Sequence, residues 1–406
     1  MGRIAIIGGG VVGLSTGIAL LDAGQAVILV DDDAAGQAAS WGNAGHIAVE
    51  QVEPLASLAQ LRSVPRRLFQ RGGALDCPPS AIGAWLPFGL RLMAAARPAR
   101  FHAGREALRG LLAQAMPTWE ALVDRIGEPT LLQQDGHYLV WQGAQAAETG
   151  RAAWTAADTG TAHVHDAYET EITILSALTT QPLTGAIRFT GSGQIADLAA
   201  LRQALRAAFV TAGGEIVGRS ATLCRTGHGV EVTGVEADRV ILCAGVRSRA
   251  LMEGLGYKVP MIAERGYHIR ADAADWPADL PPIVFEERSM IVTRYRDCVQ
   301  AASFVELGRI DAPADPRKWE RLERHVAELG LPIRAPFTRW MGCRPTLPDY
   351  LPAIGRADKA DNLFYAFGHQ HLGLTLAPIT ARLVTDMVTE RAPQPSNSLF
   401  DIARFA

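Results

Sequence analysis

The stretch that most constrains the fold is residues 4–31, which read IAIIGGGVVG and then LSTGIALLDAGQAVILVD. Gly8, Gly10 and Gly13 stand at G-x-G-x-x-G spacing, directly after an apolar run short enough for one buried strand. In this pattern the glycines allow a tight turn, close approach of backbone to a pyrophosphate, and close packing of helix on strand. The stretch therefore predicts a strand, a phosphate-binding turn and a helix.

A second strand and an acid complete this pattern. Gly24 is predicted to end the helix, and Ala26–Val30 is a second apolar strand. Asp31 follows Gly13 by 18 residues, close to the spacing of a carboxylate that holds a ribose hydroxyl. The free N–H groups and positive end of the helix would face the phosphates. Together these features predict a dinucleotide site.

Two other interpretations of the opening stretch are weaker. It could be a buried glycine-rich turn without a ligand, or a signal peptide or membrane span. Against the second, Arg3 is the one basic residue ahead of the run, glycines interrupt it, and acids follow at once.

Composition limits the class of protein. The 406 residues allow two or three structural units. A hydrophobic content of 48% and a charged content of 20% allow a large core and argue against global disorder. The formal net charge of −3 gives no general attraction to nucleic acid or anionic lipid.

The cysteines and histidines predict no metal site and no disulfide framework. The five cysteines form no C-x-x-C pair, which favours a reducing cytoplasm. His163 and His165 lie two apart but have no third ligand near them in the sequence.

Several later segments are candidates for ligand contact. Residues 34–57 form a small, polar loop that could bring backbone against a planar ligand, or could be an ordinary surface loop. The predicted strand Val240–Cys243 stops at Ala244-Gly245, which is either a nucleotide contact or a plain strand-ending turn. A strand at Leu363–Ala366, a Gly-rich loop and a helix over 374–388 repeat the logic of the opening.

The remaining segments predict a second, different unit. Residues 55–125 read as mainly helical, and 130–141 as two short strands about an Asp135-Gly136 turn. Residues 258–310 read as an antiparallel sheet, and 339–356 as a turn-rich segment.

We therefore expect an α/β protein with an α+β insertion. Its Rossmann-type cofactor domain is discontinuous, over 1–55, 190–257 and 335–406. The substrate or cap domain, with an antiparallel sheet and a helical region, takes 56–189 and 258–334.

At this point the whole chain resembles the D-amino-acid oxidase superfamily of FAD-dependent oxidoreductases. Its pattern is most similar to bacterial D-amino-acid dehydrogenases, including the D-hydroxyproline and D-proline group. The resemblance is carried by four segments: GGGVVG at 8–13 with Asp31, SWGNAGHI at 40–47, MGCRPTLPD at 341–349 and FGHQHLGLT at 367–375.

The resemblance implies FAD, held without a covalent bond. The implied cofactor contacts are Gly8, Gly10, Val11, Val12, Gly13, Asp31, Asp32, Ser40, Asn43, Ala44, Gly45, His46, Ala221, Ala244, Gly245, Arg344, Gly368, His369, Leu372, Gly373, Leu374 and Thr375.

The resemblance also implies a substrate site. Arg344 matches the arginine that pairs with the substrate carboxylate, although a structural ion pair is the alternative. Arg265, Tyr267 and His46 are implied substrate contacts, and Arg344, Tyr267 and His369 the catalytic set. His369 could equally brace its loop by packing.

The chain departs from the family pattern at two places. Trp41 is added before Gly42, where the family usually has Ala, and Trp41 is expected to narrow the pocket. Some relatives attach flavin through a cysteine near the G-x-R-P segment, but that cysteine aligns with Gly342 rather than Cys343.

The expected activity is oxidative deamination of D-amino acids, cyclic ones among them, by hydride transfer from Cα to flavin N5 to give an imine. Two alternatives stay open: a nicotinamide-dependent dehydrogenase and a non-catalytic flavin-binding subunit of a larger complex. The electron acceptor could be a quinone, oxygen or another carrier. A cytoplasmic location, peripheral contact with the inner face of a membrane, and oligomer formation are compatible with this expectation.

Overall fold

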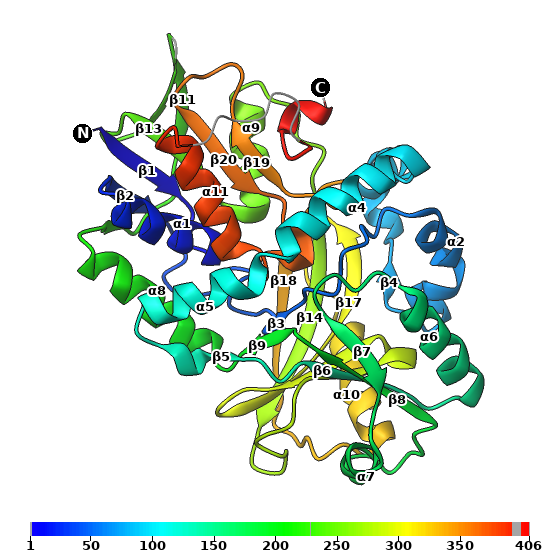
Figure 1. The fold of residues 1–406 in the computed structure, drawn as a ribbon. Coiled ribbons are helices and arrows are strands. Elements are labelled where there is room, and N and C mark those ends of the chain that lie inside the picture. Colours follow the sequence, from blue (N-terminus) through cyan, green and yellow to red (C-terminus); the bar gives the residue numbers. More distant parts are fainter. Residues whose placement is uncertain (1, 228, 392–398, 406) are drawn as a thin grey trace.

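A computed structural model describes residues 2–227, 229–391 and 399–405. The chain builds two main sheets, which Figure 1 shows as an upper unit holding the N-terminal strands and a lower unit holding β6, β8 and the long strands β14 and β17. The chain passes between the two sheets several times, so each sheet contains strands that are far apart in the sequence. The site described below lies where these two sheets meet.

The first sheet has the parallel core expected of a dinucleotide fold. Its strands, in spatial order, are β10 (Glu215–Val217), β2 (Ala26–Val30), β1 (Arg3–Ile7), β13 (Arg239–Leu242), β20 (Leu363–Phe367) and β19 (Ala353–Arg356). The first five run parallel, and β19 is antiparallel to β20. The Rossmann-type prediction is confirmed.

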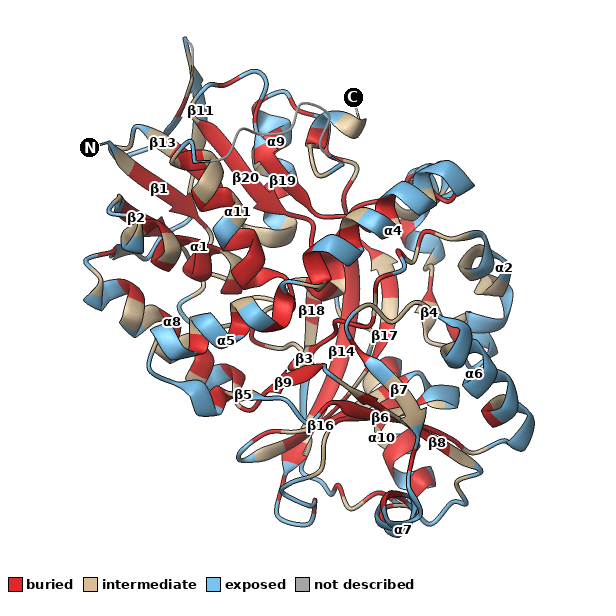
Figure 2. Ribbon diagram, viewed as in Figure 1, coloured by how far each residue is buried: buried red, intermediate tan, exposed pale blue. Residues whose placement is uncertain are grey.

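Helices and a hairpin cover the two faces of this sheet. One face carries α1 (Val11–Asp22), α8 (Leu198–Thr211) and α11 (Ala377–Val388), whose apolar residues share a core with β1 and β2. The other face packs against the hairpin β11 (Leu223–Thr226) and β12 (Gly229–Val232) and against α9 (Ser248–Gly254). Burial on both faces explains why these strands read as unbroken apolar runs (Figure 2).

The second sheet is mostly antiparallel, as predicted for residues 258–310. Its strands, in order, are β18 (Thr338–Thr346), β14 (Ile262–Asp272), β17 (Cys298–Gly308), β16 (Met290–Arg294), β15 (Ile283–Phe285), β6 (His137–Trp141), β8 (Gly185–Thr190) and β7 (His163–Asp166), with β4 (Leu75–Asp76) beside β17. The pairs β15–β6 and β17–β4 are parallel. Helix α10 (Pro316–Leu329) packs on this sheet.

One segment differs from the turn predicted over 339–356. Thr338–Thr346 is strand β18, paired along its length with β14. It therefore joins the larger sheet, although the predicted division placed 335–406 in the cofactor domain. The prolines misled the prediction because Pro345 lies on an edge strand, where a missing N–H costs no ladder bond.

The two short strands predicted over 130–141 exist but do not form a hairpin. β5 (Leu132–Gln133) joins β9 (Gly193–Ile195) and β3 (His46–Ile47) in a small sheet, whereas β6 enters the large one. Gly136 between them has a φ of 72°, and a Cβ there would overlap the carbonyl oxygen of Phe189.

The helical prediction for 55–125 is confirmed by α2 (Leu58–Arg67), α3 (Ile82–Ala95), α4 (Pro98–Leu112) and α5 (Ala115–Arg125). Helices α6 (Ala144–Ala156) and α7 (Glu169–Ala177) follow. Among the described residues, no helix has both the length and the apolar character to cross a membrane. Helix α3 does expose Ile82, Leu86, Leu90 and Met93.

Candidate active site

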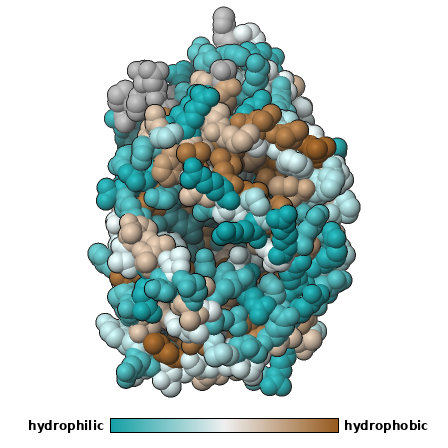
Figure 3. Space-filling view, turned by 90° about the vertical axis from the view of Figure 1, so that its right-hand side faces the viewer, coloured by the Kyte–Doolittle hydropathy of each residue, from teal (hydrophilic) through white to brown (hydrophobic). Residues whose placement is uncertain are grey.

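A cavity of about 1910 Å³ lies between the two sheets and takes its walls from both. Ordinary small-molecule pockets measure roughly 300–1,000 Å³, so this one has room for a dinucleotide and a second, smaller molecule. The face shown in Figure 3 is hollowed near its centre, with hydrophobic residues gathered beside the hollow.

The opening motif forms the turn that its glycines predict. Gly8 has a φ of 107°, and a Cβ there would come 2.6 Å from the Cys243 carbonyl oxygen. A Cβ on Gly13 would overlap the Gly8 carbonyl oxygen, so α1 packs directly on the turn. Helix α1 begins at Val11, whose N–H donates to Ser40 Oγ at 3.2 Å. The backbone at the start of α1, from Gly10 to Val12, borders the cavity, and N–H groups at such a helix N-terminus suit a pyrophosphate.

The two acids after β2 have different surroundings. Asp32 accepts hydrogen bonds from Arg247 Nη1 at 2.7 and 2.8 Å and from the Ser220 hydroxyl. The hydrogen bond from Ser220 is the main cause that lowers the pKa of Asp32. The Asp31 carboxylate lies against Gly9, where a Cβ would come 2.5 Å from its Oδ2. Asp31 therefore fits the ribose role better than Asp32.

The loop after β2 is tied to the C-terminal loop. The Ala48 N–H donates to the buried Thr375 hydroxyl at 3.0 Å. The carbonyl oxygen of Asn43 accepts from Tyr295 and Gln300 of the large sheet. Residues 40–48 therefore hold their path through contacts with the C-terminal loop and with the region of the large sheet, which a free surface loop would lack.

Most predicted cofactor residues reach the cavity wall. Those that line it are Gly8, Gly10, Val11, Val12, Asp31, Asp32, Ser40, Asn43, Ala44, His46, Ala221, Ala244, Gly245, Arg344, His369, Gly373 and Leu374. Those that support the wall from behind are Gly13, Gly45, Gly368, Leu372 and Thr375.

Arg344 lies on β18 and lines the cavity, with 28% of its side chain exposed. Its Nη1 donates to Glu264 Oε1 at 3.1 Å and to the Phe304 carbonyl oxygen at 3.2 Å. Within the described part of the chain, its Nε and Nη2 donate to no protein atom. One end of the guanidinium is fixed, and the other end can bind an anion.

Glycine 266 makes room for this arginine. A Cβ at Gly266 would overlap the Arg344 guanidinium. The side chain of Arg344 can therefore lie directly against the backbone of the neighbouring strand, β14, only because residue 266 is glycine. Glu264 is 2% exposed and also accepts from the Thr346 hydroxyl at 3.1 Å and the Tyr350 hydroxyl at 3.3 Å. Thr346 in turn forms an isolated antiparallel bridge with His369.

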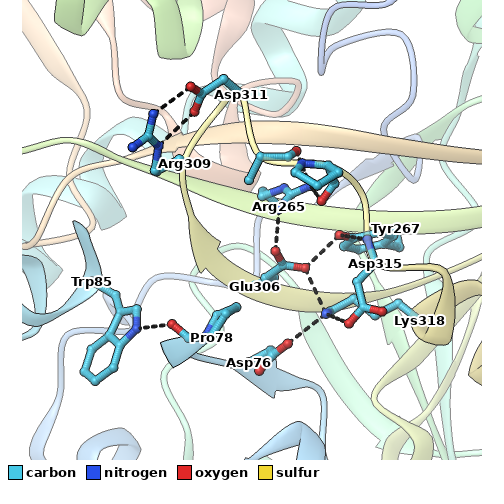
Figure 4. Close-up of polar contacts among 12 residues, drawn as sticks. Asp76, Pro78, Trp85, Arg265, Tyr267, Glu306, Arg309, Asp311, Asp315 and Lys318 are labelled. Atoms are coloured by element: carbon cyan, nitrogen blue, oxygen red, sulfur yellow. Dashed lines mark hydrogen bonds and ion pairs between the residues drawn. The ribbon is translucent and has the colours of Figure 1, made fainter. Parts of the chain in front are cut away.

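Arg265 does not reach the cavity wall, contrary to its predicted substrate role. It is 2% exposed, and its guanidinium donates to Glu306 at 2.5 Å and to the carbonyl oxygens of Ala312 and Pro313 (Figure 4). Tyr267 borders the cavity, but its hydroxyl donates to Glu306 Oε2 at 2.7 Å. Neither polar group is available to a substrate in this arrangement.

Strand alternation explains this difference. Side chains along a strand point to opposite faces in turn, and Glu264, Gly266 and His268 line the cavity. Arg265 takes the other face and meets a buried charge network. The β14–β17 register shifts between Arg265 and Tyr267, and Tyr267 borders the cavity while its hydroxyl joins the same network. Sequence similarity identified the correct strand but not which of its faces borders the site.

At the centre of that network is Lys318, whose side chain is 0% exposed. Its Nζ lies 2.7 Å from Asp76, 2.8 Å from Glu306 and 3.0 Å from Asp315 (Figure 4). Through these contacts α10 is joined to β4 and β17.

His369 is placed as a brace rather than as a proton donor. It lines the cavity but is 3% exposed, and its Nε2 lies 3.0 Å from Thr380 Oγ1 on α11. Burial lowers the pKa of His369 to about 4, so the ring is neutral at neutral pH.

The sequence led us to expect that Trp41 narrows the pocket, and this expectation is wrong. Trp41 is 7% exposed, belongs to the core beneath the first sheet and is absent from the cavity wall. Trp340 of β18 takes that role instead, stacked on His268 with ring centroids 4.9 Å apart. A Cβ on Gly42 would overlap the Trp340 indole, which accounts for glycine there.

Two buried groups beside the cavity were not predicted. Glu50 lies 3.0 Å from His46 Nε2; burial opposes its charge, but His46 holds the pKa of Glu50 at about 2. His371 contacts Gln51, and burial lowers the pKa of His371 to about 4. The motif match at 40–47 ends before Glu50 and Gln51, so no sequence signal marked these two residues. His371 lies inside the match at 367–375, but the resemblance assigned it no role.

These residues fit FAD. The turn at Gly8–Gly13 suits the pyrophosphate, Asp31 the ribose, and the loops at 40–48 and 368–375 the ring end of an extended dinucleotide. The free end of Arg344 suits a carboxylate beside that ring.

Comparison with known proteins agrees with this geometry. The chain is 28% identical to a D-amino-acid oxidase of Bradyrhizobium diazoefficiens, covering 99% of both proteins. It is 29% identical to D-amino acid dehydrogenase 2 of Ralstonia nicotianae, covering 99% of this chain and 100% of the relative.

A solved structure and a family model extend the comparison. The iminodiacetate oxidase of Chelativorans sp. BNC1 matches the fold with a TM-score of 0.72, 18% identity and 98% coverage of each chain. The model of the FAD dependent oxidoreductase (DAO) family matches residues 3–387. The chain is thus a member of the DAO family of FAD-dependent oxidoreductases.

Proposed function

We propose that this oxidoreductase dehydrogenates D-amino acids, cyclic ones such as D-proline and D-hydroxyproline among them. The observation that carries the proposal is the guanidinium of Arg344, which is fixed at Nη1 and, among the residues that the structure describes, has no protein partner at Nε and Nη2. The names of the two relatives, an oxidase and a dehydrogenase of D-amino acids, support the substrate class.

The residues of the chain would act by positioning. Arg344 binds the carboxylate through two parallel N–H donors, which fixes the orientation of Cα. Trp340 and His268 form an aromatic wall beside it. When bound, FAD supplies the two-electron acceptor for the hydride that leaves Cα, while the nitrogen lone pair of the neutral amine forms the C=N bond. Such positioning can supply an effective molarity of roughly 10⁵ M or more.

The test is anaerobic mixing of the purified flavoprotein with a panel of D-amino acids, with the L-enantiomers as controls. We expect D-amino acids to bleach the visible absorbance of the flavin and L-enantiomers to leave it. If no D- or N-substituted amino acid bleaches it, the proposal fails. A yellow protein that stays inert until a partner is added would instead indicate a non-catalytic subunit.

A further inference from the structure

A second group of ligand-type side chains lies at the cavity wall, where His46 and Glu50 line the cavity and His137 packs behind them. His46 on β3, Glu50 just after it and His137 on β6 offer two imidazoles and a carboxylate, whose ligand atoms all lie within 4.8 Å of one another. We call these three residues the His–Glu cluster. It is assembled from two distant parts of the chain.

The cluster is buried but incompletely bonded. Glu50 and His137 are each 4% exposed. Glu50 Oε1 meets His46 Nε2 at 3.0 Å, yet Glu50 Oε2 and His46 Nδ1 have no hydrogen-bond partner among the described residues. A buried carboxylate oxygen without a hydrogen-bond partner is destabilising, because it has lost its contacts with water and gained none in return. Such a group indicates an ion or a water molecule at that place.

His137 has the surroundings of a metal ligand. Its Nδ1 lies 3.2 Å from Ser192 Oγ, and its ring stacks on Phe189 with centroids 4.2 Å apart. Histidines that bind metals commonly use one ring nitrogen for the metal and the other for such a hydrogen bond. Ser192 and Phe189 therefore fix the ring with Nε2 left over.

The ligand types select the kind of ion. Two imidazole nitrogens and one carboxylate suit Zn²⁺ and neighbouring first-row divalent ions, whereas Ca²⁺ and Mg²⁺ prefer oxygen ligands. The 3.0 Å between His46 Nε2 and Glu50 Oε1 is near the separation of two ligands that share a tetrahedral ion with bonds of roughly 2.0–2.1 Å. The three ligand atoms lie within 4.8 Å of one another, so binding of an ion would draw His137 closer to the other two.

We propose that the His–Glu cluster binds one divalent transition-metal ion, with Zn²⁺ as the representative. His46 and Glu50 line the cavity, so the ion would sit in its wall and join the segment after β3 to β6 of the large sheet. This proposal is independent of which substrate the enzyme oxidises.

The test uses the FAD-loaded protein, dialysed against a chelator and then titrated with Zn²⁺ alone in a calorimeter. We expect one Zn²⁺ per chain, and an anomalous-scattering peak at the cluster in crystals grown with Zn²⁺. Glu50→Gln and His137→Asn should weaken binding by about 100-fold or more, because loss of an outer partner alone costs roughly 10–100-fold. Ser192→Ala should weaken it by roughly 10–100-fold.

The control is His163→Asn, which removes an exposed histidine of β7 outside the cluster and should bind Zn²⁺ as the unmodified protein does. Absence of stoichiometric binding, or a water molecule only at the cluster in the crystal, would overturn the proposal. So would affinity unchanged in the cluster variants. If a variant does not fold, the anomalous peak of the unmodified protein decides.

Discussion

Glu264 holds Arg344 from the neighbouring strand, with 3.1 Å between Glu264 Oε1 and Arg344 Nη1. The contact is fixed in turn because the hydroxyls of Thr346 and Tyr350 donate to the other oxygen of Glu264. The arginine that faces the cavity is therefore set by a buried carboxylate before any substrate arrives.

Arg344→Ala should raise the KM for the amino acid about 100-fold while FAD stays bound. Loss of a charge-assisted bidentate contact costs roughly 3 kcal/mol, and the residues that suit the phosphates and the ribose, Gly8–Gly13 and Asp31, would be left in place. Steady-state kinetics and flavin content measure both effects. Arg339→Ala is the control, because that arginine of β18 pairs with Glu323 away from the cavity. An unchanged KM would remove Arg344 from the carboxylate role.

Glu264→Gln should raise KM roughly 10-fold, since Gln keeps the size of the side chain but loses the charge that fixes Arg344. Flavin content and thermal stability should change little. The discriminating measurement is the Kd of a simple carboxylate inhibitor, which should weaken in parallel with KM. A variant with lower stability and unchanged KM would show that Glu264 acts only in folding.

Gly42→Ala should displace the Trp340 indole, because the added Cβ would overlap it. We expect a change in the relative kcat/KM for small and large D-amino acids. The same overlap should lower FAD affinity and stability in Gly42→Ala, and adding Trp340→Leu in the same chain should restore both, as a double-mutant cycle would show. Additive effects of the two changes would contradict this contact.

Lys318→Met should lower the free energy of unfolding by about 3–5 kcal/mol, because it leaves the buried carboxylates of Asp76 and Glu306 and the partly buried one of Asp315 without their shared cation. Chemical denaturation measures this. Arg317→Met is the matched control: Arg317 also pairs with Asp315, but its side chain is 70% exposed, so its loss should cost about 0–1 kcal/mol. If Lys318→Met and Arg317→Met lose the same unfolding free energy, burial does not determine how much these ion pairs stabilise the fold.

The buried side chain of His369 should make the folded protein less stable in acid. Its folded pKa of about 4 lies below the value of 6.5 for a free histidine. As pH falls below 6.5, the unfolded chain takes up a proton that the folded chain refuses, so stability decreases until about pH 4. At pH 5 the loss from this residue is about 2 kcal/mol.

Unfolding experiments at pH 7 and pH 5 check this prediction. His369→Gln preserves a hydrogen-bonding group for Thr380 and should remove about 2 kcal/mol of the difference between the two pH values. His163→Gln, at an exposed position, should leave the difference unchanged. The same difference in all three proteins would refute the buried, neutral state of His369.

The flavin should be released by acid precipitation, as expected for non-covalent FAD. Burial raises the pKa of Cys343, so the reactive thiolate is scarce. Cys343→Ser should keep its flavin content. Flavin that stays with the precipitated protein of the unmodified chain but not of this variant would demonstrate a covalent bond.

The sequence predicted the elements whose signal is local. The turn at Gly8–Gly13, the acid after β2 and the strand before Gly368 are each encoded within a few residues, and all three are found as predicted. What it could not predict depends on pairing across the chain. The edge position of β18, the face of β14 that borders the site, and the meeting of His137 with Glu50 all follow from sheet register between distant segments.

The bridge between Thr346 and His369 joins the strand of Arg344 to the loop that closes the cofactor end of the cavity. If Arg344 binds the substrate carboxylate as proposed, this bridge links the position of the carboxylate site to that of the 368–375 loop. Trp340 lies on the same strand, six residues before the bridge. A substitution at Trp340 would therefore reshape the cavity wall without removing either partner of this bridge.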